Sequence, residues 1–221
     1  MQNQNNQFNQ RLIFATNNQH KVDEIKVVIG TQFNVVTLKD AGIDIDIPEP
    51  HDTLEANATE KSTIIHRLTG DHVFGEDTGL EVIALNGEPG VKSARYAGEG
   101  RDFQANIDKL LANLNGNANR NARFRTVISL ILNGKEYLFD GICEGQIVAQ
   151  QKGLKGFGYD PVFIPNGGDN TFAEMTIEEK NVFSHRKKAT DKLIAFLKNN
   201  TLADFAEKKH NKLFKSSFIS S

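Results

Sequence analysis

The chain has 221 residues, and 26 Lys and Arg stand against 28 Asp and Glu, so its formal net charge is −2. This balance argues against a protein dedicated to nucleic acid or to membrane surfaces, and the single cysteine, Cys143, excludes a disulfide framework and a cysteine-rich zinc site. Neither an apolar run of about 18 residues nor a secretory signal is visible, so a cytoplasmic location is expected.

Order along the chain is expected to begin near residue 11. Eight of the first ten residues are Gln or Asn, which have almost nothing apolar to bury, so residues 1–10 are predicted to be a disordered leader. Residues 11–200 are predicted to form one α/β domain. Residues 201–221 form a basic tail, to which the sequence assigns no role.

The first candidate site is a polar turn between a strand and a helix. Residues 12–15 are a short apolar run typical of a buried strand, and residues 22–29 repeat apolar side chains at helical spacing up to Gly30. In the turn between them, free backbone N–H groups at the helix start favour an anion, and Lys21 adds a positive charge. The turn is a candidate phosphate site, or alternatively an ordinary capped turn with a surface lysine.

An acid on stiff backbone follows the second predicted strand, residues 34–38. Glu49 lies between two prolines in the next loop. Mg²⁺ usually takes one or two protein carboxylates and shares the phosphates of its substrate, so Glu49 is a candidate ligand. The alternative is a solvated loop acid. A helix capped by Asp52 or Thr53 is predicted to follow and to end at Gly70.

A pair of acids ends the third predicted strand, residues 72–76. Residues 77–79 predict a break in this strand, and ligands bind near the carboxyl ends of strands in α/β folds. Neighbouring strand residues face opposite ways, so Glu76 and Asp77 are not both expected to serve one ion. Asp77 is the better candidate because it lies on the predicted turn. The alternative is an Asx-turn that closes the strand.

The second half of the sequence predicts a helix and a hairpin. Asp102 can cap the helix, and residues 124–132 and 137–143 read as strands joined by a turn at Asn133 and Gly134. Strands that alternate with helices, together with a hairpin, indicate an α/β fold with a mixed sheet. We expect two lobes around a cleft, with Cys143 in the core.

A loop rich in glycine and aromatic residues spans residues 153–165. Its Phe157 and Tyr159 offer ring faces that can stack on a purine, and its Asp160 can accept hydrogen bonds from ring N–H groups. The alternative is a packed loop in which the aromatic side chains fill the core.

Basic residues gather at a corner between the last two predicted helices. Thr176 with Glu179 matches a capping box, and Ser184 can cap the final helix. Lys180, His185 and Arg186 bring donors to this corner, and the arginine or a backbone N–H there can read a carbonyl on a base. The alternative is a helix cap with solvated basic residues.

Taken together and in this order, these segments resemble the noncanonical purine nucleoside triphosphate pyrophosphatases, the inosine/xanthosine triphosphatase family. The match covers roughly residues 12–197 and consists of several separate motifs. They are residues 15–21, 57–61, 76–82, 89–98, 156–163, 178–181 and 184–186.

The resemblance implies a fold and a reaction. The fold would be a mixed, elongated, twisted β-sheet with flanking helices that form two lobes around a central cleft. The reaction would be Mg²⁺-dependent hydrolysis of ITP, dITP and XTP to the nucleoside monophosphate and pyrophosphate. The resemblance also implies a homodimer, and neither nucleic acid nor membrane is expected as a partner.

The resemblance also assigns roles by position. Asp77 would accept the proton of the attacking water and, together with Glu49, bind the metal, while Lys61 would assist with the phosphates. The residues implied for substrate binding are Thr16, Asn17, Asn18, Gln19, His20 and Lys21 at the phosphates, and Thr78, Phe157, Gly158, Tyr159, Asp160, Lys180, His185 and Arg186 at the nucleoside.

Two residues depart from the family pattern. Asn17 replaces the usual glycine, and Asn is the side chain that best tolerates a positive φ. Ala56 stands beside Glu55 where many relatives carry a glutamate, which leaves the role of a second helix acid open.

Hydrogen bonding can explain how the site would select a base. A donor such as the Arg186 side chain or a backbone N–H would pair with the 6-oxo group of hypoxanthine and clash with the amino group of adenine. How guanine is excluded, and the preference among ITP, dITP and XTP, stay open. A related enzyme for a modified pyrimidine or dUTP, and a nucleotide-binding protein without catalysis, remain as alternatives.

Overall fold

The computed structural model describes residues 8–31 and 33–200 and contains a seven-stranded mixed sheet. The strands are β1 (Phe8–Phe14), β2 (Phe33–Thr37), β3 (His72–Val82), β4 (Pro89–Gly90), β5 (Asn121–Leu132), β6 (Lys135–Ile147) and β7 (Phe163–Pro165). The helices are α1 (Gln19–Ile29), α2 (Leu54–Thr69), α3 (Phe103–Asn113), α4 (Ile177–Phe183) and a C-terminal helix over residues 185–200.

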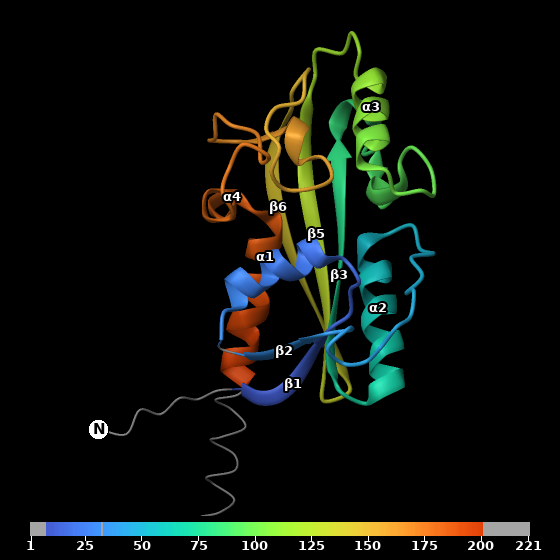
Figure 1. Ribbon diagram of the computed structural model, residues 1–221, viewed down its shortest axis with the longest axis vertical. Coiled ribbons are helices and arrows are strands. Elements are labelled where there is room, and N and C mark those ends of the chain that lie inside the picture. Colours follow the sequence, from blue (N-terminus) through green and yellow to red (C-terminus); the bar gives the residue numbers. More distant parts are fainter. Residues whose placement is uncertain (1–7, 32, 201–221) are drawn as a thin grey trace, which may run out of the picture.

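The sheet order is β2-β1-β3-β5-β6-β7, and the short β4 pairs with β3 off this path. β1 runs parallel to β2 and to β3. From β3 through β5 and β6 to β7, each strand is antiparallel to the next. The long strands β3, β5 and β6 run along the molecule and connect its two halves (Figure 1). The predicted mixed α/β sheet is confirmed, and its Asn133–Gly134 turn joins β5 to β6 as expected.

One half of the molecule has helices on both faces of β1 and β3. On one face, α1 and the C-terminal helix cover a cluster that includes Phe14, Ile25 and Leu193. On the other face, α2 packs through Ile65 against Val73. Figure 1 shows this half below the other, with α1 and α2 on opposite sides of the sheet.

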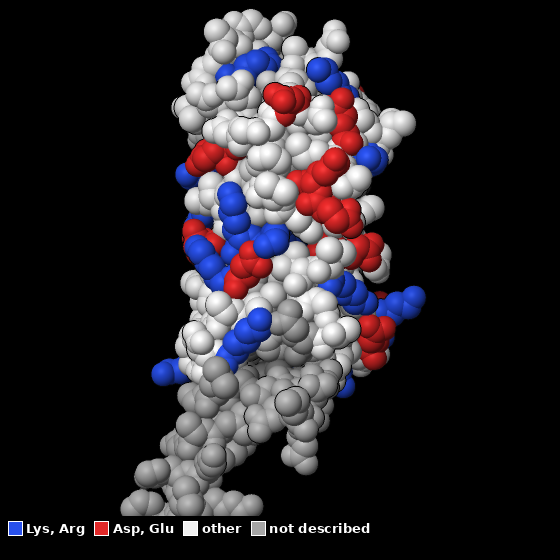
Figure 2. Space-filling model, turned by 90° about the vertical axis from the view of Figure 1, so that its left-hand side faces the viewer, with Lys and Arg blue, Asp and Glu red and all other residues white. Residues whose placement is uncertain are grey.

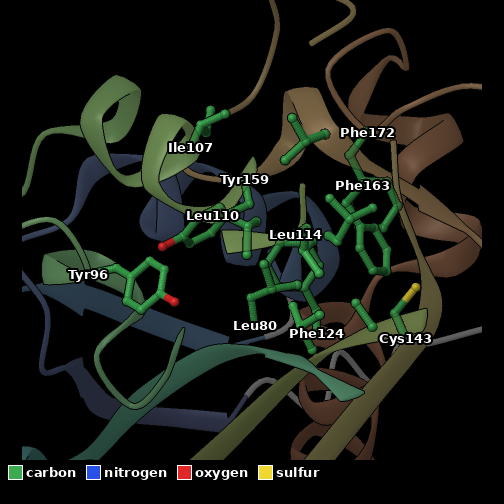
Figure 3. Packing of buried hydrophobic residues seen from close by; sticks show 14 of the residues in the cluster. Leu80, Tyr96, Ile107, Leu110, Leu114, Phe124, Cys143, Tyr159, Phe163 and Phe172 are labelled. Carbon is green, nitrogen blue, oxygen red and sulfur yellow. The ribbon is translucent and has the colours of Figure 1, made fainter. Parts of the chain in front are cut away.

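The other half has its own core between α3 and the strands β5, β6 and β7. Figure 3 shows Leu110 of α3 and Leu114, the residue that caps its C-terminus, packed toward Phe124 and Leu80 of the sheet. Cys143 lies in this cluster and is buried, as predicted, and burial raises the pKa of its thiol to about 11.

Two predictions about chain boundaries are wrong. β3 continues through residues 77–79, where a break was expected. Gly79 does not break the strand; it lets β4 approach, because a Cβ there would lie 2.6 Å from Gly90 O. The predicted disordered leader also ends too late: residues 8–10 belong to β1, whose backbone pairs with β2. Residues 1–7 and 201–221 lie outside the described residues.

The surface charge is locally balanced on the face shown in Figure 2. Basic and acidic side chains of the described residues lie next to one another there, in keeping with the formal net charge of −2. In residues 8–31 and 33–200, none of the helices combines the length and hydropathy that crossing a membrane requires.

Candidate active site

A cavity of about 410 Å³ lies where the two halves meet. The turn before α1, the loop before α2, the middle of β3, the loop before β7 and the start of the C-terminal helix all contribute to its wall. The resemblance assigned roles to seventeen residues, and all of them except Gln19 line this cavity. The Gln19 side chain donates to Asp23 on the exposed side of α1.

Asp77 lies on the cavity wall with both carboxylate oxygens bonded. Lys61 Nζ donates to Asp77 Oδ1 at 2.9 Å, and Asn57 Nδ2 lies 3.3 Å from Oδ2. Both partners project from α2. A Cβ at Gly75 would lie 2.7 Å from Ala58 O, so glycine at this position is what allows α2 to approach β3 this closely. Tight packing of helix on strand therefore orients the carboxylate.

Glu49 lies beside Asp77 and shares one of its partners. Lys61 Nζ is 2.5 Å from Glu49 Oε1 and thus bridges the two carboxylates. Arg95 holds the loop by donating to Glu49 O at 2.7 Å, with its other terminal nitrogen 3.5 Å from Oε2. Burial acts to raise the pKa of Glu49, but Lys61, together with Lys21 and Arg101, outweighs burial and lowers that pKa. Glu49 is therefore held as an anion.

Glu76 faces the opposite side of β3, as the alternation of a strand requires. Arg186 donates to it from Nε and Nη2 at 2.9 to 3.0 Å, and Lys21 Nζ lies 3.2 Å away. Arg186 also pairs with Glu24 of α1. Burial acts to raise the pKa of Glu76, but Arg186 and Lys21 outweigh it and lower that pKa far below its ordinary value. Glu76 thus anchors two cations.

The predicted phosphate turn is an ordered cap. Asn18 Oδ1 accepts from Lys21 N at 3.3 Å, and Thr16 Oγ1 accepts from Asn18 N at 3.1 Å. The positive φ expected for Asn17 is not found: its backbone has a negative φ. Its side chain instead donates to Ile45 O at 2.8 Å and ties the turn to the neighbouring loop.

The loop before β7 folds around the carboxylate of Asp160. Phe157 N donates to Asp160 Oδ2 at 3.0 Å, and Lys180 Nζ lies 2.6 Å from the same oxygen. A Cβ at Gly156 would lie 2.1 Å from this oxygen, so the loop requires glycine there. Tyr159 is buried and donates to Ser93 O at 2.9 Å, so its ring is packed as the alternative reading expected.

Aromatic rings from both halves meet at the cavity. His20 of α1 stacks on Phe157 with ring centroids 5.0 Å apart, and His185 stacks on Phe124 at 4.7 Å. Among the described residues, His185 Nδ1 is the buried side-chain polar atom without a hydrogen-bond partner. Burial lowers the pKa of His185 well below its ordinary value, and Arg186 adds to this effect, so the ring is neutral near pH 7.

Sequence reasoning missed several residues of the site. Glu24 pairs with Lys180 and Arg186, and its signal was an acid beside the apolar positions of an amphipathic helix. Arg101 and Phe103 line the cavity from the loop and helix after Tyr96, where no motif marked them. The sequence left open whether an acid near position 56 of α2 serves the site. Glu55 pairs with Arg125 and does not line the cavity.

The site can be tested for its fit to a divalent cation. In the described chain, no group of three or more His, Cys, Asp and Glu side chains is arranged to hold a metal. Glu49 and Asp77 nevertheless turn one oxygen each toward a single cation, the ammonium of Lys61. Two hard oxygen donors suit Mg²⁺, which completes its coordination with water and substrate phosphates. The donor set therefore fits Mg²⁺ bound jointly by protein and substrate.

Comparisons with known proteins agree on one family. The model of the Ham1 family matches residues 12–196. A dITP/XTP pyrophosphatase of Flavobacterium psychrophilum is 49% identical over 189 residues, which are 86% of this chain and 100% of that protein.

Solved structures give the same result. The Ham1 protein of Staphylococcus aureus is similar with a TM-score of 0.78 and 39% identity, over 86% of this chain and 99% of that one. A nucleoside-triphosphatase, a dITP/XTP pyrophosphatase, from Mycobacterium abscessus is similar with a TM-score of 0.68 and 37% identity, over 83% of this chain and 98% of that one.

Proposed function

Because the chain belongs to the Ham1 family, we propose that it hydrolyses dITP, ITP and XTP to the nucleoside monophosphate and pyrophosphate. The enzyme is a nucleoside triphosphate diphosphatase. The observation that carries the proposal is the position of Asp77, whose carboxylate lines the cavity beside Glu49 and is oriented by Lys61 and Asn57.

The cofactor of the proposed reaction is Mg²⁺, bound by Glu49 and Asp77. When bound, it neutralises phosphate charge and lowers the pKa of a coordinated water. Lys61 keeps both carboxylates turned toward one point, and Arg95 holds the Glu49 backbone in place.

The residues near the expected phosphate position have two roles: they hold the triphosphate, and they activate the attacking water. Residues 16–18, His20 and Lys21 line the cavity. The free N–H groups at the start of α1 and the Lys21 ammonium would hold the triphosphate so that its α-phosphorus is open to attack. Asp77 would accept the proton as water adds to this phosphorus, because a carboxylate within hydrogen-bond reach can act as general base. The bond from the α-phosphorus to the bridging oxygen then breaks and pyrophosphate leaves.

Base selection falls to the start of the C-terminal helix. The Arg186 side chain is already paired with Glu24 and Glu76, so we assign the recognition of the base to backbone N–H groups of this helix rather than to the guanidinium. Lys187 N and Lys188 N donate to Ser184. The two N–H groups before them in this helix, at residues 185 and 186, precede its first helical hydrogen bond and are free to donate elsewhere. These fixed donors suit a 6-oxo acceptor and disfavour the 6-amino group of adenine.

The base itself would lie beside Phe157, which lines the cavity, with His185 Nδ1 available for a further hydrogen bond. A purine ring gains stacking energy against such an aromatic face. The homodimer, and a cytoplasmic location, remain part of the proposal.

One assay tests the function. Release of pyrophosphate is measured with dITP, ITP, XTP, GTP, ATP and dUTP, in Mg²⁺ and in EDTA. We expect turnover of the first three, little of ATP, and loss of turnover in EDTA. Preference for dUTP would instead indicate the pyrimidine enzyme, and tight binding of ITP without pyrophosphate release would indicate a binding protein.

A further inference from the structure

One cation on the cavity wall differs from the others in its surroundings. In the described part of the chain, the lysines and arginines that line the cavity are Lys21, Lys61, Arg101, Lys180 and Arg186. Four of them have side chains that are at most 13% exposed and a carboxylate oxygen within 3.2 Å. Arg101 is 52% exposed, and its ion pair, with Glu49, spans 3.9 Å.

The four buried cations are already matched by acids. Lys21 faces Glu76, Lys61 bridges Glu49 and Asp77, and the remaining two share Glu24, Glu76 and Asp160. A triphosphate brings about four negative charges, which phosphoryl transfer requires to be neutralised. Cations that are paired with carboxylates can neutralise only part of this charge. A cation that can leave its partner and move to the phosphates would supply more.

The backbone at Arg101 is unusual as well. Its φ is +51°, in the left-handed region that side chains other than Gly, Asn and Asp rarely adopt. The next residue, Asp102, caps α3 by accepting from Ala105 N at 3.0 Å, which ties the loop to the helix at this point. Unfavourable backbone of this kind often accompanies a functional side chain.

We propose that Arg101 is a substrate-binding residue that moves from Glu49 to the oxygens of the β- and γ-phosphates when a triphosphate binds. The inference rests on the proposed function and names a further residue for the same site. A guanidinium binds phosphate through two parallel hydrogen bonds, which a lysine cannot reproduce. Because the side chain is more than half exposed, it can make this movement without breaking buried contacts.

A purely structural role toward Glu49 accounts poorly for Arg101. Glu49 already has Lys61 at 2.5 Å and two contacts from Arg95. An exposed partner at 3.9 Å adds little to stability. If stability were its purpose, glycine would serve the left-handed backbone better than arginine.

Binding of pyrophosphate tests the inference without requiring turnover. Calorimetry compares pyrophosphate and dIMP binding by the wild type, Arg101→Ala, Arg101→Gly and Arg101→Lys. We expect the Kd of pyrophosphate to rise roughly tenfold to hundredfold in the Ala and Gly variants, the usual effect of losing a charged hydrogen bond, and less in the Lys variant. The Kd of dIMP should stay within about twofold, because dIMP lacks both distal phosphates.

Kinetics and stability complete the test. The KM for dITP should rise in parallel with the pyrophosphate Kd, and Arg101→Gly should melt at or above the wild-type temperature because glycine relieves the backbone. Arg67→Ala, which removes an exposed arginine of α2 outside the cavity, is the matched control. Unchanged pyrophosphate binding in Arg101→Gly would overturn the inference. Absence of dITP turnover in the wild type would instead count against the proposed function.

Discussion

Glu76 and Asp77 are neighbours on β3, yet their carboxylates lie in opposite environments. Glu76 has no exposed side-chain surface and is enclosed by the guanidinium of Arg186 and the ammonium of Lys21. Asp77 lies on the cavity wall, where Lys61 holds one of its oxygens. One strand thus carries a carboxylate enclosed by cations on one face and a carboxylate that lines the cavity on the other.

This comparison distinguishes a carboxylate that stabilises the fold from one that can take part in the reaction. A buried carboxylate surrounded by cations has its hydrogen-bonding capacity used by the protein, and removal of one partner leaves an uncompensated charge. A carboxylate on a cavity wall can exchange partners with water, metal or substrate. The two faces of β3 should therefore respond oppositely to substitution, with stability lost on one face and activity on the other.

The largest effect is expected from Asp77→Asn. Loss of a general base lowers kcat roughly 10²-fold to 10⁴-fold. Stability should change by no more than about 2 kcal/mol, since Lys61 keeps Glu49 and an amide oxygen can still accept its hydrogen bond. Pyrophosphate release and urea unfolding measure the two quantities. Full turnover in this variant would end the assignment of Asp77 as proton acceptor.

The matched change on the other face, Glu76→Gln, should mainly destabilise the fold. It leaves Arg186 and Lys21 buried without their shared carboxylate, which costs about 3–5 kcal/mol when one partner of a buried pair is removed. Urea unfolding at pH 7 measures this loss, with Asp77→Asn as the control. Equal stability of the two variants would contradict the distinction between the faces.

A smaller effect is expected from acid. Burial acts to raise the pKa of Glu24, but Arg186 and Lys180 outweigh it and lower that pKa to about 2, from an ordinary value of 4.5. Because the folded state has the lower pKa, this stabilisation is present above about pH 4.5 and is lost as the pH falls toward 2. It amounts to roughly 3 kcal/mol.

Glu24→Gln isolates that contribution. The unfolding free energy of the wild type, measured in urea at pH 7, 4.5 and 3, should fall more steeply between the last two values than that of the variant. Glu178→Gln, which changes an exposed acid of α4, should follow the wild type. Parallel curves for wild type and Glu24→Gln would show that the network does not titrate in this range.

Local signals predicted most of the elements. The helix ending at Gly30, the cap at Thr53 and the capping box of Thr176 and Glu179 are all confirmed, because such signals act within a few residues. Gly79 was misread as a strand break. Its role depends on Gly90, which packs against it from another strand, and no local pattern reports such an approach.

The sequence by itself determined the order of the long strands and helices and the family resemblance, and through that resemblance it named most of the residues that line the cavity. Tertiary structure alone decided what each charge does. Glu24 and Arg186 are 162 residues apart, yet they meet in the core. Glu76 and Asp77 are adjacent, yet they serve opposite faces. The physical reason is that the role of an ionisable group depends on its burial and its partners, and both arise from contacts between distant segments.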